Sequence, residues 1–121
     1  MISRVCFPIA TVFLVIATGA PSPRARGQEV QVVEVTAERF SFSPSEVRAK
    51  VGSTIEFRLR SEDTAHGFHI LQTDVNGVVP KRGQGTLTIR FQPARSGRYT
   101  FECSRLCGAG HSFMRGTIDV E

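Results

Sequence analysis

The sequence lacks several features that would point to other classes of protein. No apolar run reaches the roughly 20 residues that a membrane-spanning helix needs. The longest run covers residues 5–20, which is 16 residues, and it contains Pro8. No long helical period follows residue 27, so a helical domain is not expected. The 121 residues contain no internal repeat and no tryptophan, and their number allows one domain at most.

The N-terminal segment has the features of a secretory leader. Arg4 precedes the apolar run, and residues 21–27 (PSPRARG) are rich in turn formers and place the small residues Ala25 and Gly27 where a signal peptidase reads the chain. A positively charged N-terminal region, an apolar central region and small residues at the cleavage site are typical of a signal peptide. We expect cleavage after Gly27, which leaves residues 28–121 as the exported domain. An uncleaved membrane anchor formed by residues 1–27 is the alternative.

Outside this leader, basic and acidic residues nearly balance. The formal net charge of +4 comes from 15 basic and 11 acidic residues, but Arg4, Arg24 and Arg26 all lie in the leader, which has no acid. Residues 28–121 therefore hold 12 basic and 11 acidic residues, a net charge of +1. Nucleic-acid binding needs basic residues clustered on a folded face, so a nucleic-acid partner is not expected.

The rest of the chain alternates apolar and polar residues with period two. The clearest segment, residues 54–60 (TIEFRLR), places Ile55, Phe57 and Leu59 on one face and charged residues on the other. Comparable segments occupy 30–35, 39–43, 46–51, 65–71, 86–91, 98–103 and 116–121. Seven or so short strands at this spacing predict an all-β fold, either a β-sandwich or a Greek-key barrel.

Two local expectations follow from the same pattern. The segment 46–51 is expected to bury Val47, Ala49 and Val51. Residues 72–85 are expected to form the longest loop, with a tight turn at Asn76 and Gly77.

Four metal-binding side chains lie within 12 residues near the C-terminus. Cys103, Cys107, His111 and Met114 follow the spacing C-x3-C-x3-H-x2-M. Thiolate and thioether sulfurs together with imidazole suit copper better than magnesium or calcium. Two glycines between Cys107 and His111 give the backbone the freedom to curl round a metal.

A second imidazole has to come from outside this loop, because electron-transfer copper sites use two histidines, a cysteine and a weak axial methionine. The other two histidines are His66 and His69. His66 shares the parity of Phe68 and Ile70, so it faces the core at the start of a strand, just after a turn at Asp63. We expect His66 to be a ligand, and His69 to face solvent or to act outside the ligand shell.

Simpler explanations exist for each residue taken alone. Cys103 and Cys107 could form a plain disulfide after export, a methionine on a strand is usually part of a core, and a histidine near a turn is usually solvated. Zinc is another metal candidate, but zinc sites usually use a C-x2-C hairpin, and Met114 would then have no role. The combination of all four donors at this spacing favours copper.

The stretch from Asp63 to Glu121 resembles the CuA domain of cytochrome c oxidase subunit II, which also occurs at the C-terminus of nitrous-oxide reductase. The shared pattern is D-x-x-H at residues 63–66 and C-S-x-x-C-G-x-x-H-x-x-M at residues 103–114. The sequence HGFH at residues 66–69 resembles the short, one-helix branch of that family. The resemblance implies a cupredoxin-like Greek-key β-sandwich over residues 28–121.

The resemblance also implies a dinuclear copper centre with two copper ions. In that family the cysteines bridge both ions, each histidine binds one ion, the methionine is a weak axial ligand, and a backbone carbonyl between the cysteines completes the set. The corresponding residues are Cys103 and Cys107, His66 and His111, Met114, and Arg105 for the carbonyl. Two thiolates shared by two ions spread the charge of one electron and limit rearrangement.

Partners follow from the same resemblance. It implies electron transfer from a c-type cytochrome or a similar redox protein to a terminal oxidase subunit, in the periplasm or at the outer face of the cytoplasmic membrane, with membrane anchoring as an option. No catalytic set for oxygen reduction is visible in this chain. Arg105 stands where the family often has an acid that joins a magnesium site, which argues against magnesium here. The absence of tryptophan and of an acidic face argues more against an oxidase subunit than against a CuA electron carrier.

Three other functions stay open from the sequence. An exported copper carrier or chaperone would use the same ligands and release its metal. A mononuclear blue-copper protein would use His66, Cys107, His111 and Met114 and leave Cys103 spare. A thiol–disulfide protein would use the two cysteines, but they lack the C-x-x-C spacing and the helix start that lower a thiol pKa.

Overall fold

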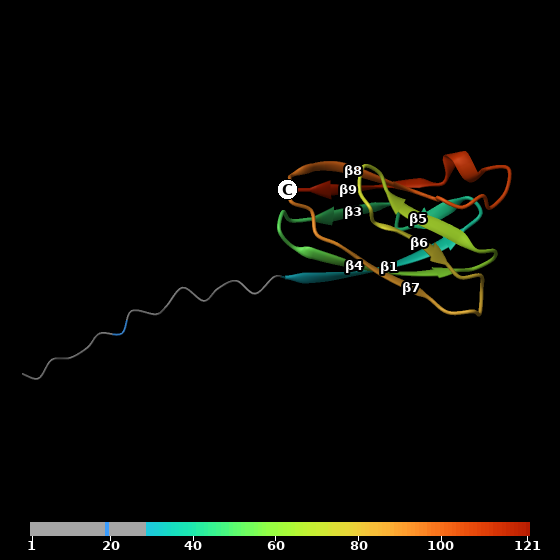
Figure 1. The fold of residues 1–121 in the computed structure, drawn as a ribbon, viewed down its shortest axis with the longest axis horizontal. Coiled ribbons are helices and arrows are strands. Elements are labelled where there is room, and N and C mark those ends of the chain that lie inside the picture. The colour runs from blue at the N-terminus through green and yellow to red at the C-terminus, as the bar shows by residue number, and fades with distance from the viewer. Residues whose placement is uncertain (1–18, 20–28) are drawn as a thin grey trace, which may run out of the picture.

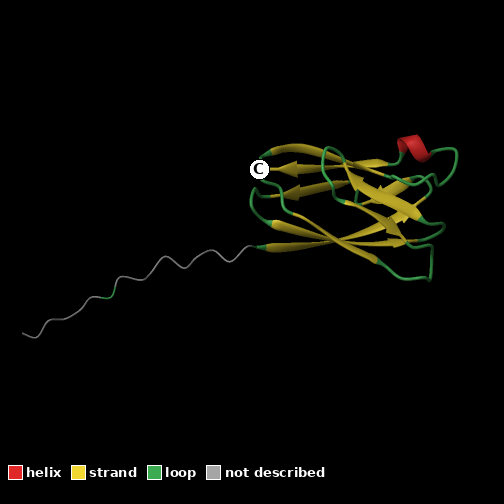
Figure 2. Cartoon of the chain, viewed as in Figure 1, coloured by secondary structure: helices red, strands yellow, loops and turns green. Residues whose placement is uncertain are grey.

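The computed structural model describes Gly19 and residues 29–121, so the expected leader lies outside the described residues except for Gly19. The described chain consists of short strands and one 3-10 turn, which confirms the all-β prediction (Figures 1 and 2). The elements are β1 (Val30–Glu38), β2 (Ser41–Ser43), β3 (Glu46–Ala49), β4 (Thr54–Ser61), β5 (His66–Ile70), β6 (Asn76–Val79), β7 (Leu87–Phe91), β8 (Gly97–Glu102), η1 (His111–Phe113) and β9 (Arg115–Val120). No helix in this part of the chain is long and apolar enough to cross a membrane.

The strands form two sheets that pack face to face. One sheet has the order β2-β1-β4-β7 and the other the order β3-β9-β8-β5-β6. Both are mixed, because β1 runs parallel to β4 and β3 runs parallel to β9, whereas the remaining pairs are antiparallel. Non-consecutive neighbours in each sheet mean that the chain crosses repeatedly between the layers, as in the expected Greek-key sandwich.

Four phenylalanines fill the space between the sheets. The ring centroids of Phe57 and Phe68 lie 5.0 Å apart, those of Phe68 and Phe101 lie 5.1 Å apart, and those of Phe42 and Phe101 lie 5.3 Å apart. All four rings are buried, and aromatic rings contribute large apolar areas to a core. Side chains alternate along a strand. Cys103, two places after Phe101, and His66, two places before Phe68, therefore face the same interior.

Two local expectations are wrong. Val51 is 44% exposed, because β3 ends at Ala49 and Val51 lies in the turn that leads to β4. Residues 76–79, expected within a loop, form β6 and pair with β5. Gly77 does not mark a tight turn there. Its missing side chain gives room to Leu87, whose Cδ2 atom would lie 2.9 Å from a Cβ on residue 77, and a close approach of this kind is a common role of glycine in a strand.

Four connections converge at one end of the sandwich. The registers place Ala37 beside Ser61 and His66 beside Val79, so the β1–β2, β4–β5 and β6–β7 connections all leave the sheets at the same end. The long β8–β9 connection, residues 103–114, joins them and carries η1 (Figure 1). The predicted metal-binding residues therefore meet at this end, which we call the loop end.

Candidate metal centre

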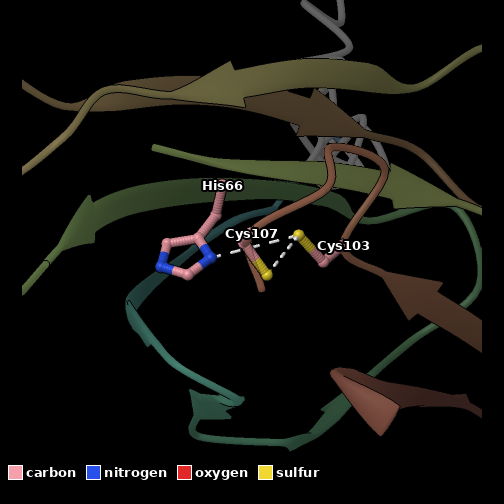
Figure 3. A group of neighbouring side chains, drawn as sticks. All are labelled: His66, Cys103 and Cys107. Atoms are coloured by element: carbon pink, nitrogen blue, oxygen red, sulfur yellow. Dashed lines mark hydrogen bonds between the residues drawn. The ribbon is translucent and has the colours of Figure 1, made fainter. Parts of the chain in front are cut away.

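The first group of donors centres on Cys103. His66, the first residue of β5, is fully buried, and its Nδ1 atom lies 4.0 Å from the Cys103 Sγ atom (Figure 3). The backbone carbonyl oxygen of Arg105 lies 3.0 Å from the same sulfur. This group contains one imidazole, one thiol and one backbone carbonyl.

The second group centres on Cys107. The Nδ1 atom of His111, in η1, lies 3.7 Å from the Cys107 Sγ atom, and the Met114 Sδ atom lies 3.9 Å from it. Met114 is fully buried, whereas His111 is half-buried. This group contains one imidazole, one thiol and one thioether, so it mirrors the first group.

The two groups meet at the sulfur atoms. The Sγ atoms of Cys103 and Cys107 are 3.7 Å apart and both cysteines are free (Figure 3). A disulfide requires about 2.05 Å between the sulfurs, so the two side chains are placed as neighbouring thiols. The ligating atoms of His66, Cys103 and Cys107 all lie within 4.8 Å of one another, which is compact enough to hold a metal ion.

The observed separations fit metal binding. In zinc sites, which have the same kinds of donor, the metal lies about 2.3 Å from thiolate sulfur and about 2.0 Å from imidazole nitrogen. Two sulfurs that share an ion can then be at most about 4.6 Å apart, and a sulfur and a nitrogen about 4.3 Å. The sulfur–sulfur distance of 3.7 Å and the sulfur–nitrogen distances of 4.0 and 3.7 Å lie below these limits.

Asp63 orients the His66 ring. The His66 Nε2–H group donates to the Asp63 Oδ1 atom at 2.6 Å, which leaves Nδ1 free to face the sulfurs. The amides of Thr64 and Arg39 donate to the same carboxylate at 2.7 and 2.8 Å. Burial by itself raises the pKa of Asp63, but the hydrogen bonds from Arg39 and His66 outweigh it, so this pKa lies below its ordinary value. An ionised carboxylate behind a ligating histidine fixes the ring and increases its basicity.

The metal has to displace a thiol proton at this site. Burial, with the hydrogen bond to Cys103 as the next cause, raises the pKa of Cys107 to about 11. The side chain is therefore a thiol at neutral pH when no metal is present. Only the thiolate binds a metal, so metal binding releases protons.

Two glycines in the ligand loop give room to a side chain from the other sheet. The turn after β1 places the Phe40 ring against Gly108 and Gly110, and the Phe40 Cε1 atom would lie 2.9 Å from a Cβ on Gly108. The neighbouring Arg39 donates from Nε to the carbonyl oxygen of Cys107 at 2.7 Å. The β1–β2 turn thus supports the ligand loop, a role that the sequence did not indicate because the contact spans 68 residues.

Gly67 lies directly beneath Cys103. Its amide donates to the Cys103 sulfur at 3.4 Å. A Cβ on residue 67 would lie 2.7 Å from the backbone nitrogens of both Ser104 and Arg105, and closer still to the Ser104 hydroxyl. A glycine between His66 and Phe68, inside a strand pattern, is a recognisable sign of close backbone approach, and it is the signal by which the sequence could have indicated this contact.

His69 lies apart from these donors. It is half-buried, and its Nε2 atom lies 3.1 Å from the Thr73 carbonyl oxygen, in the turn that follows β5. It is not among the clustered ligating residues of the described chain. Of the two histidines outside the loop, the structure brings only His66 to the site.

The comparisons with known proteins agree with this fold. Residues 8–120 match the model of the cupredoxin-like domain family. The chain is 35% identical over 96 residues to cytochrome c oxidase subunit 2 of Thermus thermophilus, an alignment that covers 78% of this chain and 69% of the relative. The chain therefore belongs to the cupredoxin-like family and, within it, to the family of cytochrome c oxidase subunit 2. A second version of that subunit from the same species matches at the same identity, and there the chain spans 55% of the relative.

Solved structures show the same relationship. A heme-copper terminal oxidase dimer contains a chain that superposes with a TM-score of 0.62 at 28% identity, covering 84% of this chain and 75% of that one. The periplasmic domain of subunit II of the cytochrome oxidase of Bradyrhizobium japonicum superposes with a TM-score of 0.67 at 18% identity, covering 75% and 83%. The second likeness concerns the fold alone.

Proposed function

We propose that this protein carries electrons through a dinuclear, CuA-type copper centre. The observation that supports this proposal most strongly is that the donor atoms fall into two matching groups. Each group has one imidazole nitrogen, one cysteine sulfur and one weak donor, and the two groups meet at sulfurs 3.7 Å apart. A mononuclear site would use one of the cysteines and leave the other without a role.

The residues that would hold copper are His66, Cys103, Arg105 through its carbonyl, Cys107, His111 and Met114. Bound copper supplies a one-electron redox couple. The chain supplies a dry environment: both cysteines and Met114 are at most 5% exposed, and His66 is fully buried. Strand β5 and the Phe68–Phe101 core lie directly beneath His66 and Cys103, so these two donors have little freedom to rearrange when the charge of the site changes.

The relatives suggest where this electron transfer takes place. We infer an exported protein that acts in the periplasm or at the outer face of the cytoplasmic membrane, that receives electrons from a c-type cytochrome or a similar redox protein, and that passes them to a terminal oxidase subunit. The identity to an oxidase subunit and the likeness to a chain of a terminal oxidase support this inference.

A redox titration of the copper-loaded protein tests the proposal. We expect two copper ions per chain and one electron taken up for every two ions, because the shared thiolates make the pair a single redox unit. One copper and one electron per chain would instead indicate a mononuclear blue-copper protein. Two coppers that are lost rapidly to a mild chelator and do not cycle would indicate a carrier or chaperone.

A matched pair of cysteine variants assigns the sulfurs. Replacing Cys103 by serine should lower the copper content to one ion or none, and replacing Cys107 by serine should do the same. If the Cys103→Ser protein keeps the copper content and spectrum of the wild type, Cys103 is not a ligand and the dinuclear proposal fails.

A further inference from the structure

Unpaired positive charge gathers at the loop end. Arg39, Lys81, Arg82 and Arg105 are all exposed. None of the four forms an ion pair with an acid of the described chain. We call these four residues the basic patch.

Three members of the basic patch are tied to the metal centre by their own contacts. Arg105 lies between the two cysteines. The Arg39 side chain donates to the Cys107 carbonyl oxygen at 2.7 Å. The Arg82 amide donates to the Asp63 carbonyl oxygen at 3.0 Å, next to the carboxylate that holds His66. These three residues of the patch therefore lie beside the candidate ligands.

Most acids at the same end are already engaged. Glu62 pairs with Arg60 at 3.2 Å, Glu102 pairs with Arg115 at 3.5 Å, and Asp63 is bound to His66. Glu38 is exposed there without such a partner within the described residues. Residues 28–121 carry a net charge of only +1, so the loop end is positive relative to the rest of the domain.

Two large apolar side chains protrude from the ligand loop beside the basic patch. Leu106 is 81% exposed and Phe113 is 83% exposed, the two highest values among the exposed large hydrophobic residues of the described chain. Both flank ligands, since Leu106 precedes Cys107 and Phe113 precedes Met114. Apolar side chains within a polar, charged rim are the usual composition of a transient protein interface.

We propose that the loop end docks a redox protein whose own docking face is acidic. Complementary charge steers such encounters and selects the partner by sign, and a basic patch repels a partner with a basic face. A partner seated on Leu106 and Phe113 lies next to the ligand loop, as electron exchange requires. This inference rests on the proposed electron-transfer function and specifies the chemistry of its partner.

Electron exchange with small charged reagents tests the sign of the field. The copper-loaded protein is reacted with the hexacyanoferrate couple, which is anionic, and with the hexaammineruthenium couple, which is cationic. The variant K81E/R82E reverses the charges of two residues that are not copper ligands. The control variant K50E/R95E reverses two exposed charges at the opposite end of the sandwich. At low ionic strength we expect K81E/R82E to slow the anionic reaction about tenfold and to speed the cationic one, while the control stays within about twofold of wild type.

Salt provides an internal check. The Debye length falls from about 30 Å at 0.01 M to about 3 Å at 1 M ionic strength, so the difference between K81E/R82E and wild type should vanish at high salt. Equal rates for the two proteins at low salt, or a faster reaction of wild type with the cationic reagent, would overturn the proposal.

Binding of charged peptides locates the surface without relying on copper. We expect a peptide of glutamates to shift the amide resonances of residues 38–40, 81–84 and 104–113, and a peptide of lysines to leave them unchanged. Shifts confined to the other end of the sandwich would overturn the proposal. Binding to phosphatidylglycerol vesicles without binding to the glutamate peptide would assign the patch to a membrane surface instead. Absence of copper and of all electron exchange would refute the proposed function, while the peptide result would still decide the docking surface.

Discussion

The two histidines at the metal centre are held in opposite ways. His66 begins a strand, is fully buried and has its Nε2 atom fixed by Asp63 at 2.6 Å. His111 lies in a 3-10 turn of the ligand loop, is half-buried, and that turn has no capping hydrogen bond from a side chain. The Nδ1 atoms of both rings nevertheless lie within 4.0 Å of a cysteine sulfur.

We use this difference to divide the site into a fixed half, around His66 in β5, and an adjustable half, which is the ligand loop with Cys107, His111 and Met114. The fixed half belongs to a strand of the folded core. The adjustable half is a connection between strands, supported by Arg39 and Phe40 from the opposite sheet. We infer that the strand provides a preformed binding position and that the loop completes it, which is how a site can be accurate and still admit its metal.

Replacing each histidine by alanine is the strongest test of this division. Both variants should lose copper. Without metal, His66→Ala should lower the free energy of unfolding by about 2–4 kcal/mol, because it leaves a buried gap and removes one hydrogen bond of the Asp63 carboxylate. His111→Ala should change it by no more than about 0.5 kcal/mol, as for a surface position. Denaturant unfolding of the apo proteins measures both, and equal losses would remove the distinction between the halves.

Gly67→Ala places a side chain between the two halves. The new Cβ meets the backbone of Ser104 and Arg105, which cannot move as a side chain does. We expect a loss of about 1–3 kcal/mol of stability from overpacking, together with weaker copper binding. The double variant G67A/S104A is the control: it removes the hydroxyl contact but not the backbone contact, so it should stay destabilised. Full recovery would show that only the hydroxyl matters.

Asp63→Asn tests how the fixed histidine is oriented. The amide keeps the size of the side chain and removes the charge behind His66. Loss of such a partner typically lowers metal affinity by about 10- to 100-fold. Competition with a chelator measures the affinity, and Glu62→Gln, next to Asp63 but paired with Arg60, should behave as wild type. An unchanged affinity in Asp63→Asn would mean that the strand alone orients the ring.

Arg39→Ala tests the support of the adjustable half. It removes the hydrogen bond from the arginine side chain to the Cys107 carbonyl and keeps the amide that binds Asp63. We expect the free energy of local unfolding of the ligand loop to fall by about 1 kcal/mol. Amide hydrogen exchange should then become faster in residues 104–113 and change little in β5. Arg60→Ala, an exposed charge of the same end, is the control. Faster exchange in β5 as well would show that the two halves are one cooperative unit.

The smallest effect on stability is expected at Glu56, which lies away from both histidines. Hydrogen bonds from Arg58 and Arg90 lower the pKa of Glu56 on the outer face of β4. A carboxyl with a lowered folded-state pKa contributes stability above its unfolded pKa, near 4.5, and loses that contribution as the pH falls through the folded value. Glu56→Gln should therefore be less stable than wild type at neutral pH and should approach it in acid, both with and without copper. A pH dependence that appears only in the copper-loaded protein would contradict this.

The sequence predicted the strands, and which side chains come together at the loop end, better than it predicted the contacts that support them. Alternation identified the inward faces of β4, β7 and β8, and parity alone separated His66 from His69. The pair Asn76–Gly77 led to a wrong prediction, because the rule for turns considers neighbours in the chain, whereas the pairing of these residues with β5 makes them part of a strand. Arg39 and Phe40 gave no local signal, since their contacts to the ligand loop exist only after both sheets have formed.

Electron paramagnetic resonance of the oxidised, copper-loaded protein examines the central claim most directly. Two matching groups of donors joined at Cys103 and Cys107 predict one unpaired electron whose hyperfine pattern is shared by two copper nuclei. Splitting by a single copper nucleus, or a protein that takes up no copper and links its two cysteines as a disulfide, would contradict the account.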